Sequence, residues 1–358
     1  MANDDIALAI AHLDAERFAE AEVLCRRVLM HSPYSIHATN CLGVTLGRLG
    51  RYEEAVAVLQ PLAEARSDVV GISMNFGIAL RGARFFAEAE RWLRKALALD
   101  PKSVGVYINL GAVLADLGRN AEAIVAFREA VALDPTRAEA RHMIAALEGK
   151  TPDSPSPDYV RGLFNDYADR FESDLVGTLD YRVPQALRAI VGSGPFHRAL
   201  DLGCGTGLVG VAFKDCTAEI VGIDLAERMI AEARKKNIYT SLHALDILDY
   251  FASDDARARP FDLIVAAEVF IYVGKLDHVF APARAHMVPG GCFAFSVEEC
   301  ATGTFALQPS GRYAHSRAYI EDLARAHGFT VVASDTVSIR KHREGAADGL
   351  IFVLRRTR

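Results

Sequence analysis

The stretch Ala199-Leu-Asp-Leu-Gly-Cys-Gly-Thr-Gly-Leu-Val-Gly210 sets a glycine-rich turn between a short apolar run and a helical pattern. Such a turn lets a ligand approach the backbone closely, because a side chain there would occupy the ligand's volume. Asp201 leads the compact form of the turn, whereas the spacing Gly205-x-Gly207-x-x-Gly210 also satisfies the dinucleotide pattern. The turn therefore predicts a nucleotide-type site and leaves its ligand open between NAD, ATP and a nucleoside sulfonium.

Short apolar runs alternate with helical segments on both sides of this turn. We expect strands over 198–202, 219–224, 241–245, 261–267 and 291–297, and helices over 208–213, 226–236, 276–287 and 317–327. This alternation predicts a parallel sheet with helices on both faces and a ligand at the carboxyl ends of the strands. Residues 329–339 and 350–355 read as two strands joined by a polar loop too short for a crossover helix, so they should pair antiparallel.

A period of 34 residues runs through the first part of the chain, marked by Gly43, Gly77 and Gly111. Small residues and prolines keep the same period: Ala21, Ala55, Ala89 and Ala123, with Pro33, Pro101 and Pro135. The small residues let two helices approach closely, and the proline ends the second helix. Over residues 2–135 the pattern resembles the tetratricopeptide repeat in about four units, followed by a capping helix over 137–147.

Repeats of this kind stack into a concave surface that binds peptides or protein termini. Asn75 and Asn109 occupy the same position in successive units, as in repeat arrays whose asparagines hold a peptide backbone, and this ladder breaks at Cys41. The resemblance implies a protein or peptide partner. Two alternatives stay open: the asparagines only tie helices together, or the array mediates self-association into a homo-oligomer.

A proline- and serine-rich seam over residues 149–158 separates the two patterns. Three prolines and no apolar period predict an extended linker that neither continues a helix nor joins a core. We therefore expect a repeat domain over 1–148, a linker over 149–158 and an α/β domain over 159–358.

The α/β half resembles class I S-adenosylmethionine-dependent methyltransferases. The likeness rests on the Asp201-led turn, on Asp224 and Asp246 after the second and third strands, and on the closing hairpin. The stretch 158–176 with Leu179-Asp-Tyr181-Arg182-Val-Pro184 looks like bacterial methyltransferases that carry tetratricopeptide repeats. The resemblance implies an α + α/β chain: a helical repeat array, then a Rossmann-like domain with a mostly parallel seven-stranded sheet and a C-terminal antiparallel hairpin.

A carboxylate at Asp224 can accept from ribose hydroxyls, although NAD enzymes use the same device and a helix N-cap is the plain alternative for it and for Asp246. The family resemblance assigns S-adenosylmethionine, with S-adenosylhomocysteine as product, to a set of positions. They are Tyr167, Phe171, Tyr181, Arg182, Asp201, Gly203, Cys204, Gly205, Gly207, Asp224, Leu225, Asp246, Ile247 and Ala267. The aromatic pair Tyr167 and Phe171 would shield the methyl group, or would simply belong to the core.

The acceptor side should follow the fourth and fifth strands. Glu268 and Tyr272 stand at the expected strand edge, and His315 lies in a segment, 300–316, where this class often has a lid. If the acceptor is a hydroxyl or an ammonium, a base must remove its proton, and His315 has the most suitable intrinsic pKa. We therefore list Glu268, Tyr272 and His315 as catalytic candidates.

Composition limits the remaining classes. A net charge of −6 with no basic half disfavours nucleic acid as a partner, and the segment 266–272 lacks the Asn/Asp-Pro-Pro-Tyr/Phe block of base-modifying relatives. The six cysteines show no C-x-x-C spacing, the histidines show no metal-ligand spacing, and no apolar run approaches a bilayer span. We expect a cytosolic, metal-free protein, and keep a non-catalytic cofactor-binding scaffold and a nicotinamide oxidoreductase as competing hypotheses.

Overall fold

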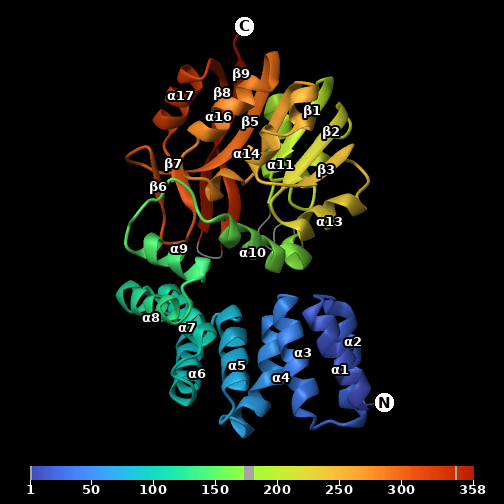
Figure 1. The fold of residues 1–358 in the computed structure, drawn as a ribbon, viewed down its shortest axis with the longest axis vertical. Helices are drawn as coiled ribbons and strands as arrows, with labels where there is room; N and C mark the ends of the chain where they lie inside the picture. Colours follow the sequence, from blue (N-terminus) through green and yellow to red (C-terminus); the bar gives the residue numbers. More distant parts are fainter. Residues whose placement is uncertain (1, 173–180, 343–344) are drawn as a thin grey trace. The chain divides into compact units, whose positions relative to one another are not determined.

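The computed structural model describes residues 2–172, 181–342 and 345–358. The chain divides into two compact units, Met1–Leu147 and Glu148–Arg358, drawn in blue to green and in green to red in Figure 1. No helix in the described ranges combines the length and the apolar character that crossing a bilayer requires.

The first unit is an array of antiparallel helix pairs. Its helices are α1 (Ala2–Asp14), α2 (Phe18–His31), α3 (Ile36–Arg48), α4 (Tyr52–Ala65), α5 (Val70–Gly82), α6 (Phe86–Leu99), α7 (Val104–Asp116), α8 (Asn120–Leu133) and α9 (Ala138–Leu147). Successive pairs lie side by side and share one hydrophobic core (Figure 1). The repeat array and the capping helix predicted from the 34-residue period are thus present.

The periodic glycines lie where the two helices of a pair come closest. A Cβ on Gly43 would lie 2.3 Å from Leu59, one on Gly77 would lie 2.8 Å from Leu93, and one on Gly111 would lie 2.9 Å from Phe127. Each partner lies 16 residues downstream and is buried. Close approach, rather than an unusual backbone conformation, therefore explains the period.

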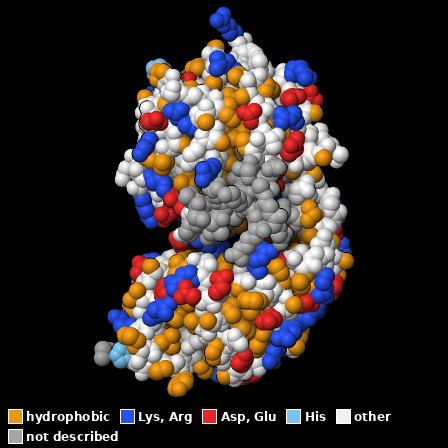
Figure 2. Space-filling view, turned by 180° about the vertical axis from the view of Figure 1, so that it is seen from behind, with side chains coloured by type: hydrophobic (Ala, Val, Ile, Leu, Met, Phe, Trp, Pro, Cys, Tyr) orange, Lys and Arg blue, Asp and Glu red, His pale blue; other side chains and the backbone are white. Residues whose placement is uncertain are grey.

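Ion-pair clusters recur on the repeat unit at twice its period. Arg51 pairs with Glu22 (2.7 Å) and Glu54 (2.6 Å). Arg119, 68 residues later, pairs with Glu90 (2.7 Å) and Glu122 (2.6 Å). Each arginine joins the second helix of one unit to that of the preceding unit, and on the face shown in Figure 2 basic and acidic side chains are interspersed.

The second unit is built on one sheet, with nine strands in the described ranges. They are β1 (Phe196–Leu202), β2 (Thr217–Asp224), β3 (Ser241–Ala244), β4 (Phe261–Ala266), β5 (Met287–Glu299), β6 (Phe305–Leu307), β7 (Tyr313–His315), β8 (Phe329–His342) and β9 (Gly345–Arg356). Strands β3-β2-β1-β4-β5 are parallel, β9 runs antiparallel to β5, and β8 pairs antiparallel with β9. These seven strands are the predicted sheet with its closing hairpin.

Helices cover both faces of this sheet. They are α10 (Pro157–Tyr167), η1 (Ala168–Arg170), α11 (Val183–Val191), α12 (Leu208–Phe213), α13 (Glu227–Lys235), α14 (Ile247–Phe251), α15 (Asp254–Ala258), η3 (Phe270–Tyr272), α16 (Asp277–Ala285) and α17 (Arg317–Ala326). Neighbouring residues of β1 serve opposite faces: Leu200 packs with α14, α16 and α17, whereas Ala199 packs with α11 and α12. Alternation along each strand thus builds two separate cores.

The structure departs from the sequence expectation in two places. The segment expected to form a lid contains the strand pair β6–β7, because Tyr313, Ala314 and His315 are buried and β7 pairs with the end of β5. The helical stretch expected over 159–191 is interrupted: α10 and η1 precede residues 173–180, which lie outside the described ranges, and α11 follows.

Candidate functional site

The glycine turn follows β1 and faces the largest described cavity, of about 620 Å³. Gly203 and Gly205 line it, and both have left-handed backbone, with φ of 61° and 53°. A Cβ on Gly205 would meet nothing nearer than the Phe171 ring at 3.6 Å, so the space above it is open. The turn is tied to β2 because Cys204 N donates to Ile223 O at 2.7 Å. A ligand can therefore approach this backbone without displacing a side chain.

Asp224 connects the turn to the end of β2. Its Oδ2 accepts from Gly205 N at 2.9 Å and its Oδ1 accepts from Ala226 N at 2.8 Å. Burial raises the pKa of Asp224 to about 6, although these backbone donors act in the opposite direction. Asp224 also lines the cavity, so it fulfils both alternatives left open by the sequence, the helix cap and the pocket carboxylate.

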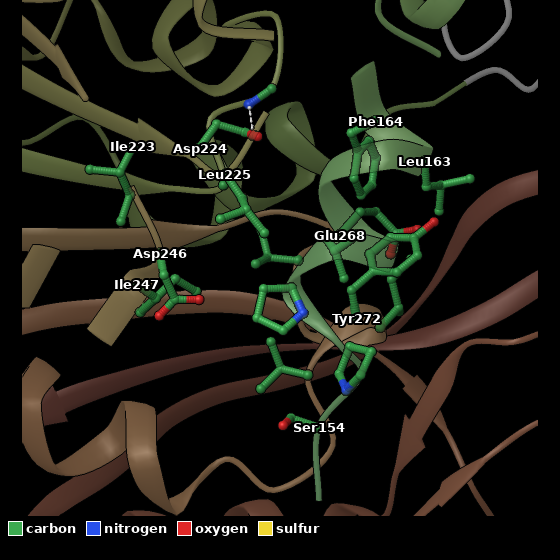
Figure 3. Close-up of a pocket in the computed structure, with 18 of the residues that line it drawn as sticks. Ser154, Leu163, Phe164, Ile223, Asp224, Leu225, Asp246, Ile247, Glu268 and Tyr272 are labelled. Carbon is green, nitrogen blue, oxygen red and sulfur yellow. Dashed lines mark hydrogen bonds between the residues drawn. The ribbon is translucent and has the colours of Figure 1, made fainter. Parts of the chain in front are cut away.

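Asp246 lies on the same side of the cavity, after β3. Figure 3 shows it together with Ile247, Ile223 and Leu225, across from Glu268 and Tyr272. Its Oδ1 accepts from Leu248 N at 2.8 Å and caps α14. This side offers apolar side chains flanked by two carboxylates, as a nucleoside with a hydroxylated sugar and an exocyclic amino group requires.

Aromatic side chains from α10 and its extension form another wall. Tyr167 and Phe171 line the cavity, with ring centroids 5.5 Å apart, and Phe164 packs edge-on against Tyr272 at 4.9 Å. Tyr181 also lines the cavity, whereas Arg182 is exposed and does not. The aromatic positions that the sequence singled out are therefore brought together at the glycine turn.

Asp201 lies behind the turn instead of in the cavity wall. It is 2% exposed, and its Oδ2 accepts from Tyr239 OH at 2.6 Å, while burial raises the pKa of Asp201 to about 8. Neither Cys204 nor Gly207 lines the cavity: Cys204 is buried, and a Cβ on Gly207 would lie 3.1 Å from the Tyr239 ring. Tyr239 thus fills the space beneath the turn, and its lone position before β3 gave no sequence signal.

Glu268 is the strained residue of the site. It follows β4 with φ of 58°, a left-handed conformation that costs free energy in a residue with a side chain. Ser296 of β5, fully buried, holds it: Glu268 N donates to Ser296 Oγ at 2.8 Å, and Ser296 Oγ donates to Glu268 Oε1 at 3.4 Å. Glu268 lines the cavity beside Ala267 and Tyr272.

Arg312 adds a cation to this side of the cavity. Its guanidinium lies 3.9 Å from a Glu298 carboxylate oxygen, and nearby Tyr272, Glu298 and Glu268 raise its pKa, against the effect of burial. Lys275 and His278 also line the cavity. Sequence reasoning assigned none of these three cations to the site, because they come from loops and helix starts without periodic pattern.

The assignment of His315 as a base needs correction. His315 is fully buried, its Nε2 lies 2.7 Å from Gly274 O, and it does not line the cavity. Burial lowers its pKa to about 4, so the ring is neutral near pH 7 and donates to the carbonyl through Nε2. The residue therefore supports the loop at Gly274, and we do not assign it a proton-transfer role.

We expect His315→Ala to lower the free energy of unfolding by about 3 kcal/mol at pH 7, because it leaves a cavity and an unsatisfied carbonyl. Wild-type stability should fall as pH drops from about 6.5 to 4, since the unfolded state binds the His315 proton first. Urea unfolding at several pH values measures both effects. His278→Ala, at an exposed histidine, is the control, and equal stability of the two variants would contradict the prediction.

The residues present fit S-adenosylmethionine. Two glycines leave backbone accessible, Asp224 and Asp246 flank apolar side chains, and the cavity volume lies within the range of small-molecule sites. Across the described ranges, no group of three or more His, Cys, Asp or Glu side chains is arranged to hold a metal ion.

Comparisons with known proteins divide the chain in the same way. The methyltransferase domain family matches residues 200–293, and the tetratricopeptide repeat family matches residues 42–102 and 74–138. The ubiquinone biosynthesis O-methyltransferase of Thiobacillus denitrificans is 34% identical over 101 residues, 28% of this chain and 43% of that protein. The malonyl-[acyl-carrier protein] O-methyltransferase of Geobacter sulfurreducens is 34% identical over 102 residues, 28% of this chain and 38% of that protein.

The chain thus spans less than half the length of these curated relatives. Among solved structures, the N-methyltransferase NodS from Bradyrhizobium japonicum WM9 with bound S-adenosyl-L-homocysteine is 25% identical, covering 49% of this chain and 86% of that one with a TM-score of 0.40. The chain therefore combines tetratricopeptide repeats with a methyltransferase domain, a family that implies S-adenosylmethionine as cofactor.

Proposed function

We propose that the second unit transfers a methyl group from S-adenosylmethionine to an acceptor bound in the same cavity. The observation that carries this proposal is the two-sided cavity of Figure 3. Gly205, Asp224 and Asp246 lie on one side, and Glu268 and Tyr272 lie on the other. A donor and an acceptor held in one enclosed space can react by in-line displacement without further protein chemistry.

The cofactor supplies an electrophilic methyl group on a sulfonium. Asp224 accepts from the ribose hydroxyls, Asp246 accepts from the adenine amino group, and Leu225 and Ile247 pack on the base. Tyr167 and Phe171 exclude water above the glycine turn, where they already line the cavity. For an acceptor with an ionisable O–H or N–H, the Glu268 carboxylate takes the proton.

We expect Glu268→Gln to slow methyl transfer about 100-fold while leaving S-adenosylhomocysteine affinity within about twofold, because the amide cannot accept the proton. Single-turnover transfer of labelled methyl to the acceptor pool of a cell lysate gives the rate, and calorimetry gives the affinity. Glu299→Gln, an exposed change at the end of the neighbouring strand, is the matched control. Full transfer by Glu268→Gln would rule out this role.

For the repeat unit we propose recruitment of a protein or peptide, through the surface that carries Asn75 and Asn109. Both asparagines are partly buried. Asn75 Nδ2 donates to Asn40 Oδ1 at 3.0 Å, and Asn109 Nδ2 donates to Gly105 O at 2.8 Å. These bonds favour the view that the side chains tie helices together, and the Asn75 amide pairs with Asn40 one residue before the predicted ladder position at Cys41. Small-molecule methylation with repeats used for self-association, and a non-catalytic cofactor-binding scaffold, remain the alternatives.

Labelled methyl transfer in a lysate of the source cells tests both parts of the proposal. Full-length wild type is compared with Asp224→Ala, which should label nothing, and with the double variant Asn75→Ala/Asn109→Ala. Label on a protein that is lost in the double variant supports recruitment, whereas label in a small molecule with every cofactor-competent variant excludes it. Binding of S-adenosylhomocysteine without any transfer would support the scaffold.

A further inference from the structure

Residues 151–157, here named the strap, connect the last repeat helix to α10. The sequence predicts them as a spacer with no part in a core. In the structure, Ser154, Pro155 and Pro157 line the cavity, and Figure 3 shows Ser154 at the end of the cavity away from Asp224. The strap thus lies against the second unit and belongs to the wall of its site.

Two hydrogen bonds fix the strap to different elements of the second unit. Leu307 N, in β6, donates to Thr151 Oγ1 at 3.1 Å. Lys275 N, in the loop between η3 and α16, donates to Asp153 O at 2.7 Å. Both donors are backbone amides that would otherwise lack a partner from their own element, so the strap satisfies groups that a free linker would leave to water.

Gly274 forms the seat beneath the strap. It is buried, and a Cβ on it would lie 2.6 Å from Asp153 O and 3.0 Å from Pro152 O. On the other side the same Cβ would lie 2.7 Å from the ring of Tyr313, which is fully buried. The backbone conformation of Gly274 is ordinary, so the strap's close approach, and not a positive φ, requires glycine here.

The seat itself is held in place. Gly274 O accepts from His315 Nε2 at 2.7 Å, and Leu276 N donates to Tyr319 OH at 2.9 Å. The His315 and Tyr319 rings stack with centroids 6.1 Å apart. The loop under the strap is therefore fixed from below, and a side chain added at Gly274 should displace the exposed strap before it displaces the buried aromatic residues.

We propose that the strap is a ligand-binding element of the cavity, whose Ser154, Pro155 and Pro157 contact the bound cofactor or acceptor and close that end of the site. Prolines suit this role because their fixed φ keeps the wall formed before the ligand arrives, which reduces the ordering cost of binding. The inference rests on the proposed function through its ligand, and it assigns site residues outside the matched methyltransferase segment.

Gly274→Ala in the full-length protein tests the role of the strap, with S-adenosylhomocysteine as the probe. If the displaced strap leaves the wall formed about one tenth of the time, calorimetric affinity falls about tenfold. Hydrogen exchange should also speed up at the Lys275 and Leu307 amides. Gly162→Ala is the matched control, since a Cβ there meets nothing within 4 Å although α10 lines the same cavity.

Thr151→Val gives a second test that leaves the seat unchanged. It removes only the acceptor for Leu307 N, and we expect about a threefold loss of affinity. It decides the question if Gly274→Ala fails to fold. Wild-type affinity in every folded variant would overturn the strap's role alone, whereas failure of the wild type to bind S-adenosylhomocysteine would overturn the proposed function and the strap's part in it.

Discussion

Asp224→Ala should weaken S-adenosylhomocysteine binding at least about 100-fold, because the carboxylate accepts from two ribose hydroxyls and each charged hydrogen bond contributes roughly 1.5–3 kcal/mol. The same change releases Gly205 N and Ala226 N from their acceptor. Isothermal calorimetry on the purified full-length protein measures the loss. Ser253→Ala, which removes an N-cap of α15 and lies outside the cavity wall, controls for capping alone.

The same carboxylate predicts the pH dependence of binding. With its pKa raised to about 6, Asp224 is ionised above pH 6 and becomes protonated below it. Since only the ionised form accepts from both hydroxyls, affinity should fall as pH decreases through 6, by up to about tenfold per pH unit below that value. The residual binding of Asp224→Asn should lack this slope. A slope that persists in Asp224→Asn would assign the titration to another group.

Gly205→Ala should reduce cofactor affinity on the order of 100-fold, because the new methyl group enters the volume that the turn leaves open to the ligand. The protein itself should still fold: the nearest atoms to the added Cβ belong to the Phe171 ring at 3.6 Å, an ordinary contact. Only the left-handed backbone conformation adds a cost, of about 1–2 kcal/mol. Calorimetry and thermal unfolding separate the two effects.

Gly303→Ala supplies the control for that backbone cost. Gly303 also has a positive φ, 78°, and a Cβ on it meets nothing within 4 Å. The two variants should therefore lose similar stability, while only Gly205→Ala loses affinity. Retention of full affinity by Gly205→Ala would show that the ligand lies away from the turn and would exclude the orientation of cofactor proposed above.

The fold was predictable because its determinants are periodic. The 34-residue spacing of Gly43, Gly77 and Gly111 reflects one packing constraint repeated along the array, and alternation of apolar runs set the order of the parallel strands. The β6–β7 pair was not predicted. Its strands are three residues each, and their burial depends on β5 and on the strap, which are distant in sequence.

The site was predictable where the residue type itself signals the chemistry. Glycines 203 and 205, Asp224, Asp246 and Glu268 line the cavity as their positions after strands implied. His315 misled because its intrinsic pKa suggested a base, while complete burial decides its actual state. Arg312 and the strap were missed because only the tertiary fold brings residues 154–157 and 312 to the same cavity.

The strap also fixes how independent the two halves of the chain can be. Helix α9 ends at Leu147, and Thr151 is already bonded to β6, so three residues form the whole tether. Fully extended, the four steps from Leu147 to Thr151 reach at most about 14 Å. If a partner bound to the repeats shifts the strap's equilibrium, thermodynamic reciprocity requires the cofactor to change the partner's affinity by the same factor. Substrate recruitment and cofactor exchange would then be one coupled equilibrium.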